Sequence, residues 1–310
     1  MKMKNQIINI LKIGKVVNIL IILVILIFLK IPVALAQSHE FSVYGSSGFS
    51  SLRYQISKGA RSDAMGADFG VGYTFVRAKG TVKNTEKILH ARWGIHTGIG
   101  LGLFNARAKV DDDQTTTKSL IDSDNHTFDL TTFFSGYNES QKTMFLNIPV
   151  MAVFKTQQFY VMGGFKFGIP LVGKYEAKKT LLINEAYYPE WDNWAKTQTF
   201  AGDGAFRGKK SHGNLNFGVS VSLAFESGIH WRINENLSIY SGAFFDYGLN
   251  NVARGSKQSF INYDHKNPEN FTTNSILSSY SNNDSSVLTT FTGNVSTMAI
   301  GIKVRLAFDF

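Results

Sequence analysis

The last thirteen residues of the chain, MAIGIKVRLAFDF (298–310), place an apolar side chain at every second position from Met298 to the final residue, Phe310. Strict alternation of this kind predicts a β-strand with one apolar face. Chain ends usually fray into polar residues, because few contacts hold them. The alternation therefore predicts a sheet whose last strand is paired and whose apolar face is covered.

The same two-residue period recurs along the chain in about eight segments, each roughly 14 to 20 residues long and so longer than an ordinary soluble strand. In WGIHTGIGLGLF (93–104) the bulky apolar side chains share one face, while His96 and four glycines share the other. We expect strands near 39–54, 64–78, 88–108, 142–155, 158–176, 214–232, 237–250 and 295–310.

The connections between these segments alternate in length. The turns at 78–86, 156–158 and 233–236 are compact, whereas those near 109–141, 177–213 and 251–294 are long. Short turns on one side and long loops on the other are typical of transmembrane barrels. We therefore predict an all-β fold, an antiparallel up-and-down transmembrane β-barrel of about eight strands spanning 37–310. A secreted soluble β-sandwich, with its apolar face turned inward, is the alternative.

The N-terminal segment 1–36 orders basic, apolar and small residues as a cleaved signal peptide does. An uncleaved inner-membrane anchor is the alternative, because the apolar run is long. Loss of the leader's five lysines lowers the formal net charge from +9 to +4, which weakens the case for a nucleic-acid partner. The absence of cysteine excludes disulfides and cysteine metal sites.

Four apolar stretches resemble outer-membrane β-barrel proteins of the Bacteroidetes type, including OmpA-like and OmpX-like barrels. They are LNIPVMAVF (146–154), FYVMGGFKFGIPLVGKY (159–175), SIYSGAFFDYGLNN (238–251) and MAIGIKVRLAF (298–308). The resemblance implies a monomer in the bacterial outer membrane, in contact with outer-membrane lipid and lipopolysaccharide. It also implies that the barrel assembly machinery recognises the terminal Phe310, and it offers no catalytic residues, metal or cofactor to carry over. The chain departs from the OmpA-like arrangement by ending at Phe310, so we expect no peptidoglycan-binding module.

Under this register, several charged side chains point into the barrel. They are Asp68, His96, Lys166, Glu226, Asp246, Lys303 and Arg305, with His230 on the same face. Charges in so narrow a lumen must be paired or hydrated. We expect a plug of ion pairs, with a narrow gated channel as the alternative.

Two prolines, Pro149 and Pro170, fall inside predicted strands. Proline lacks the amide donor that a closed sheet requires, so we expect bulges or kinks at both positions.

The long loops hold the other candidate residues. The segment 184–213 contains Tyr187, Tyr188, Trp191 and Trp194, which either bind an extracellular ligand or pack together as a stiff crown above the strands. The loop 256–286 is rich in Asn and Ser, and we expect it to be mobile. The acidic runs 111–113 and 122–126 do not complete a calcium loop, because Thr127 stands where glycine is needed.

These features predict an integral outer-membrane protein with a structural or surface-interaction role. One alternative is an outer-membrane enzyme, a protease or one that modifies lipid A, using a loop histidine among His126, His212 and His265. The other is the narrow gated channel.

Overall fold

The computed structural model describes residues 37–77, 92–284 and 287–310. The expected signal peptide, 1–36, and the expected compact turn, 78–86, lie outside these ranges. Within them, no helix has the length and apolarity needed to cross a membrane.

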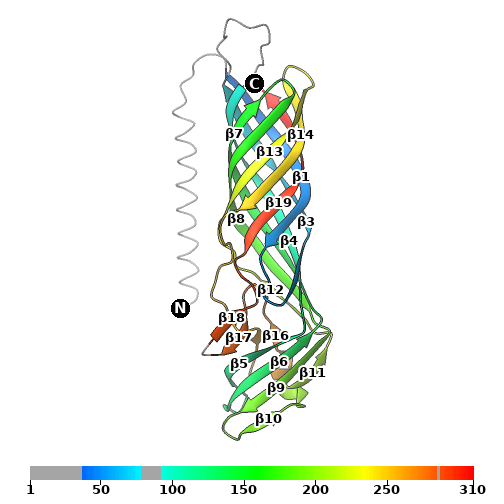
Figure 1. Cartoon of the computed structure of the whole chain (residues 1–310), viewed down its shortest axis with the longest axis vertical. Helices are drawn as coiled ribbons and strands as arrows, with labels where there is room; N and C mark the ends of the chain where they lie inside the picture. The colour runs from blue at the N-terminus through cyan, green and yellow to red at the C-terminus, as the bar shows by residue number, and fades with distance from the viewer. Residues whose placement is uncertain (1–36, 78–91, 285–286) are drawn as a thin grey trace. The chain divides into compact units, whose positions relative to one another are not determined.

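Eight strands form a closed antiparallel ring, in the order β1-β3-β4-β7-β8-β13-β14-β19 and back to β1 (Figure 1). Their bounds are β1 Gln37–Arg53, β3 Met65–Arg77, β4 Arg92–Val110, β7 Tyr137–Lys155, β8 Phe159–Lys178, β13 Ser220–Arg232, β14 Leu237–Gly248 and β19 Ser296–Asp309. The last strand pairs with the first, from Glu40 opposite Asp309 to Arg53 opposite Ser296. The predicted barrel of eight strands is confirmed.

The ring turns its bulky apolar side chains outward and its small and polar ones inward. On β4, Ile95 and Ile99 are more than half exposed, while His96 between them is buried. Glycine on the inner face leaves room for larger neighbours: a Cβ on Gly100 would lie 2.1 Å from the Tyr44 hydroxyl oxygen. The interior is therefore filled by side chains that reach across from other strands, and the exterior is apolar.

Pro170 and Pro149 behave differently. The pairing of β7 with β8 slips by one residue beside Pro170, because Phe145 lies opposite Pro170 and Met144 opposite Val172, which leaves Leu171 as the extra residue. The bulge predicted at Pro170 is confirmed. The bulge expected as one possibility at Pro149 does not form: β7 keeps its register there, while its pairing with β4 is interrupted at Pro149 itself and at Ile148.

The Leu171 bulge reverses which β8 residues face inward. Before it, even-numbered residues such as Met162 and Lys166 are buried; after it, Tyr175 and Ala177 are buried, while Lys174 and Lys178 are exposed. One extra residue in a strand shifts every later side chain to the opposite face.

The prediction that 214–232 forms one continuous strand is wrong at its start. Residues Lys210–Asn214 form a separate strand, β12, on β8, and β13 begins only at Ser220. Between them the facing reverses, so that Leu215, expected on the apolar outer face, is buried. The cause is the same as in β8, because β12 and β13 pair with β8 on the two sides of its bulge.

The long connections form a second sheet, hereafter the crown, at the end of the barrel opposite the start of β1 and the end of β19 (Figure 1). Its strands are β5 Asp113–Ile121, β6 Thr127–Ser135, β9 Leu181–Tyr188, β10 Asn193–Ala195, β11 Gly204–Arg207, β17 Tyr280–Asp284 and β18 Val287–Thr290. Three short strands and two 3-10 helices complete the part of the chain that the structure describes: β2 Gly59–Asp63, β15 Ile261–Asn262, β16 Thr272–Thr273, η1 Thr199–Ala201 and η2 Pro268–Asn270.

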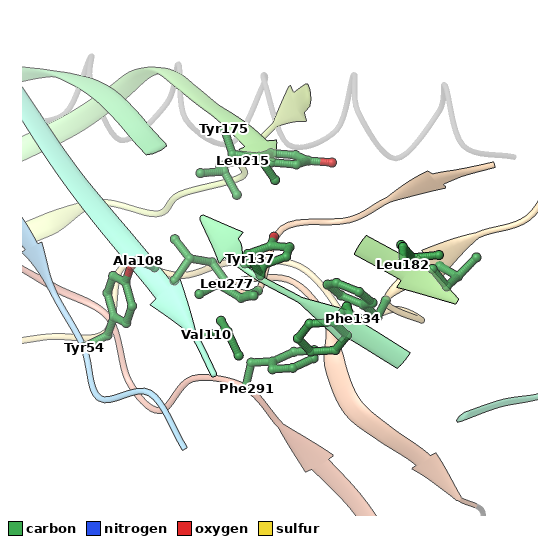
Figure 2. Packing of buried hydrophobic residues seen from close by; sticks show 14 of the residues in the cluster. Tyr54, Ala108, Val110, Phe134, Tyr137, Tyr175, Leu182, Leu215, Leu277 and Phe291 are labelled. Atoms are coloured by element: carbon green, nitrogen blue, oxygen red, sulfur yellow. The ribbon is translucent and has the colours of Figure 1, made fainter. Parts of the chain in front are cut away.

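An apolar core joins the crown to the ends of the long barrel strands. Phe134, Tyr137 and Phe291 lie close together in it, beside Val110 and Leu277 (Figure 2). The expectation that the third long loop is mobile is wrong for its middle part. Phe271, Thr273, Ser275 and Ile276 are fully buried in or beside this core, so that apolar packing and hydrogen bonds hold the segment.

The seam between β1 and β19 generates the first prediction. Ser47 and Ile302 lie directly opposite each other across it and both are exposed. Because the chain has no cysteine of its own, the pair Ser47→Cys and Ile302→Cys should form one unambiguous disulfide on mild oxidation. The crosslink should change the mobility of boiled protein in a non-reducing gel.

The matched control is Ser47→Cys with Val161→Cys, because Val161 is also exposed but lies on β8, four strands away around the ring. Equal crosslinking of both pairs, or of neither, would contradict the closed ring.

Candidate functional site

Glu226 is the centre of one ion cluster inside the barrel. It is 1 % exposed and accepts from Lys303 at 2.8 Å and from Arg305 at 2.7 Å. The Tyr160 hydroxyl donates to the same carboxylate at 3.0 Å. Glu226 lies on β13. It thus binds two cations from β19 and one tyrosine from β8, a strand that pairs with β13.

Lys166 is the centre of a second cluster, with the acid and base roles reversed. Its ammonium lies 2.5 Å from Asp246 and 3.4 Å from Asp68. Asp68 also accepts from the Tyr44 hydroxyl at 3.2 Å and from the Asn147 amide at 3.1 Å. Together the clusters contain three carboxylates and three cations, so that the buried charges balance within the barrel.

The two inward histidines take separate positions. His96 is 2.9 Å from the Thr74 hydroxyl. His230 stacks on Tyr240 at a ring distance of 4.9 Å, and its Nδ1 has no hydrogen-bond partner within the described residues. Neither histidine forms an ion pair with a described carboxylate.

A third cluster, which the sequence reasoning did not single out, lies near the end of the barrel where β1 begins and β19 ends. Lys155 contacts both Glu40 and the Tyr240 hydroxyl, and Tyr240 also donates to Glu40 at 2.8 Å. The two-residue period could have identified Lys155, because it follows Met151 and Val153 at alternate positions of β7 and all three side chains are buried.

These clusters leave little space inside the barrel. The hollow among Asn147, Lys166, Ser220 and Asp246 measures about 10 Å³, close to the least that a single water needs. Cations also lie over aromatic rings there, with Lys303 4.8 Å from the centre of Tyr44. The arrangement can brace the eight strands against one another, and a permeating ion would have to break several of its ion pairs.

Beneath the crown, two buried charged groups hold the third long loop without forming an ion pair with each other. Glu139 accepts from Tyr137 at 2.5 Å, from Gln141 at 2.7 Å, from the Ser275 hydroxyl at 2.6 Å and from the Ile276 amide at 3.1 Å. Burial raises the pKa of Glu139. The loop segment is thus tied to β7 by hydrogen bonds that its own backbone and side chains donate.

Lys179 is the other group, and it is fully buried. It donates to Ser211 at 2.9 Å and to Thr273 of the same loop. Burial lowers the pKa of Lys179 to about 7, and the negative charge of Glu139 opposes this shift only in part. The crown end of the barrel is filled here by packed protein.

The four aromatic residues expected on the surface form two ring pairs in the crown, and we refer to them together as the aromatic shelf. Tyr187 packs on Trp194 at 4.9 Å and Tyr188 on Trp191 at 5.4 Å. Trp191 and Trp194 are nonetheless 52 % and 47 % exposed. The two sequence-based readings are therefore compatible, because the rings support one another while two indoles stay open to solvent.

The loop residues considered for other chemistry are dispersed. His126 lies 3.6 Å from Asp122 and packs on Trp191, whereas His212 is exposed on β12 and His265 is exposed beyond β15. Within the described ranges, no group of three or more His, Asp or Glu is arranged to hold a metal. Phe310 is 74 % exposed, and its amide donates to the His39 carbonyl at 3.0 Å.

The Glu226 cluster generates the second prediction. Glu226→Gln should lower the free energy of unfolding by about 3–5 kcal/mol, because it leaves Lys303 and Arg305 buried without a counter-charge. Lys303→Met should be milder, because Arg305 still neutralises Glu226. Urea unfolding of the protein refolded in lipid vesicles measures both, and equal losses in the two variants would contradict the assignment of Glu226 as the shared partner.

Comparison with known proteins gives only distant likenesses. No protein-family model matches the chain, and no curated protein matches it. Among solved structures, the attachment invasion locus protein Ail of Yersinia pestis, in complex with the heparin analogue sucrose octasulfate, is 12% identical over 88% of this chain and 98% of its own, with a TM-score of 0.23. Neisserial surface protein A is 10% identical over 87% of this chain and 98% of its own, with a TM-score of 0.24.

The outer membrane protease OmpT of Escherichia coli is 8% identical over 90% of this chain and 99% of its own, with a TM-score of 0.26. Likenesses of this size assign neither a family nor a function.

Proposed function

We propose that this chain is an integral protein of the bacterial outer membrane, exported through a cleaved signal peptide, that acts at the cell surface through its crown. One observation carries the proposal. The ring buries its charges and exposes its apolar side chains, for example Ile302, which is 69% exposed on β19, while Lys303 beside it is 7% exposed. In water this arrangement would be strongly unfavourable, whereas hydrocarbon favours it.

The direction of insertion follows from the connections. The start of β1, the end of β19 and the turns at 156–158 and 233–236 lie at one end of the ring, and the crown lies at the other. Barrels of this class keep their short turns on the periplasmic side and their long loops outside. The crown is then extracellular, and Phe310 lies on the periplasmic side, where the barrel assembly machinery would meet a terminal signal.

A surface-interaction role is favoured over conduction by the filled interior. The ion clusters around Glu226 and Lys166 and the largely buried segment 271–279 occupy the path that an ion would take. A resting monomer in a planar bilayer should then show no steady conductance. The resemblance to barrels of the Bacteroidetes type agrees with this role and stays a prediction.

The contact surface that we propose is the aromatic shelf. Each exposed indole packs on a neighbouring tyrosine ring, so its apolar surface is already ordered and binding loses little side-chain entropy. Lys196 lies 5.2 Å over the Trp194 ring, which adds a cation beside the apolar area. Such a surface suits an extracellular ligand with both an apolar face and polar groups, such as a glycan or a glycoprotein.

The third prediction concerns this shelf. Replacing both indoles, Trp191→Ser with Trp194→Ser, should weaken binding of the purified protein to immobilised extracellular glycoprotein about tenfold or more, as loss of central aromatic anchors does. Folding is checked by the gel shift between unboiled and boiled samples, which both proteins should show.

The matched control replaces two exposed aromatic residues away from the crown, Trp93→Ser with Trp231→Ser, on β4 and β13. Equal loss of binding in the control, or full binding by the shelf variant, would count against the shelf as the contact surface.

A further inference from the structure

A cluster of basic side chains covers the outer surface of the barrel between its apolar belt and the crown. It contains Arg107, Lys109, Lys142, Lys174, Lys178 and Lys210, hereafter the basic array. All six side chains are exposed. We propose that the basic array binds the phosphate groups of lipid headgroups in the outer leaflet, an inference that rests on the proposed membrane location.

Strand pairing places these residues in rows around the barrel. Lys109 lies opposite Asn138, which lies opposite Lys178, which in turn lies opposite Lys210. A second row, two residues nearer the apolar belt and so about 7 Å away, holds Arg107, Ser140, Glu176 and His212. A third row holds Asn105, Lys142, Lys174 and Asn214.

The next row along the same strands is apolar. Leu103 lies opposite Met144, and Met144 lies opposite Val172. The change from apolar to basic therefore takes one row, at the level where hydrocarbon gives way to headgroups in a bilayer. A soluble acidic partner would not require the array to follow the edge of the belt in this way.

The charges of the array are not balanced by the protein. Lys178 faces Lys210 directly, and Lys142 faces Lys174, and like charges in opposed positions destabilise a sheet. Glu176 is the only carboxylate within the three rows. Within the described residues, none of the six basic side chains has an ion pair or side-chain hydrogen bond, so an external anion would relieve the repulsion.

The array also has a shape suited to a headgroup. A hollow of about 690 Å³ opens on this surface, and its lining includes Arg107, Lys109, Lys178 and Lys210 together with Asn138 and two acidic residues, the buried Glu139 and the exposed Glu176. Several cations can then surround one phosphate, with amide and hydroxyl donors beside them. A sugar phosphate of a glycolipid, whose acyl chains would lie on the apolar rows below, fits both parts of the surface.

The bulge at Leu171 is what places half of the array outside. Without the extra residue, Lys174 and Lys178 would continue the inward facing of Lys166 and enter the barrel. The same reversal turns Lys210 outward on β12 and leaves Ser211 buried. The bulge thus separates an interior with balanced charge from an exterior with excess positive charge.

The test compares two lipids that differ only in phosphate. Folded full-length protein in a neutral detergent is titrated with bisphosphorylated lipid A and with the same lipid after enzymatic removal of both phosphates. We expect binding of the phosphorylated form to be at least tenfold tighter, with the preference shrinking as salt is raised from about 0.05 to about 0.5 M, because salt screens exposed charges. Equal affinity for the two lipids would overturn the proposal.

Variants locate the effect. Lys109→Gln with Lys178→Gln and Lys210→Gln should abolish the preference for phosphate. The matched control removes three exposed positive charges elsewhere, through Arg92→Gln, Arg232→Gln and Lys266→Gln, and should keep the preference. Equal loss in both variants would reduce the effect to net charge and overturn the site.

Two competitors, inorganic phosphate and a heparin fragment, distinguish a lipid headgroup from other anionic ligands. Inorganic phosphate at 1–5 mM, roughly physiological in scale and far below a screening concentration, should not displace the lipid, because the acyl chains contribute binding. Displacement by phosphate alone, or tight binding of a heparin fragment with no preference between the two lipids, would reject a lipid headgroup as the ligand. The gel shift on boiling reports barrel formation independently, so failure of the membrane proposal and failure of the array are distinguishable.

Discussion

The pairing of β19 with β1 is the constraint on which the rest of the structure depends. Hydrocarbon offers no hydrogen-bond partner, so an unpaired strand edge within a bilayer would leave many polar groups unsatisfied. The alternating C-terminal segment closes the ring along its whole length, from Asp309 to Ser296. Once the ring is closed, each side chain of its strands points either into the barrel or out of it. The charged side chains of the apolar belt then lie inside, and the bulky apolar ones lie outside.

Inside the barrel, the buried charges are neutralised in separate clusters of ion pairs. Glu226 holds Lys303 and Arg305, while Lys166 holds Asp68 and Asp246. Each cluster joins strands that are distant in sequence, so the ion pairs also fix which strands face one another across the barrel. A solvated surface would give such pairs little value, whereas burial makes the loss of one partner expensive.

The bulge beside Pro170 marks where the charged interior ends on the side of the crown. On the side away from the crown the barrel is apolar outside and charged inside. On the crown side Tyr175 and Ala177 face inward and the basic side chains face outward. The apolar core beneath the crown then replaces ion pairs as the filling of the barrel end. One residue that interrupts the register therefore accounts for the change from a membrane-type wall to a soluble-type wall.

Much of the barrel could be predicted because alternation is a local signal. The period of two located the strands, and the same period identified the inward side of Glu226 and Lys303. It could not give the partners of those charges, since cross-barrel distances depend on the stagger of the ring. It missed Lys155 and Glu40, although both continue inward series on their strands.

The failures have physical causes as well. Leu215 is misassigned because a change of register reverses facing without any change in the local pattern. The loop around Ser275 is polar in composition and so was expected to be mobile, yet Glu139 and Lys179 supply buried partners for its hydroxyl and amide groups. Such partners lie far away in sequence and leave no local signal.

The central claim is that the ring lies in the outer membrane with the crown outside. Because the chain has no cysteine, single cysteines report location directly. Glu190→Cys in the crown, Gln157→Cys in a compact turn and Ile302→Cys on the apolar wall should be compared on intact cells with a membrane-impermeant maleimide. We expect labelling of Glu190→Cys alone, with Gln157→Cys labelled only after the outer membrane is permeabilised and Ile302→Cys least reactive in both conditions. Labelling of all three on intact cells, or of Gln157→Cys in preference to Glu190→Cys, would contradict the account.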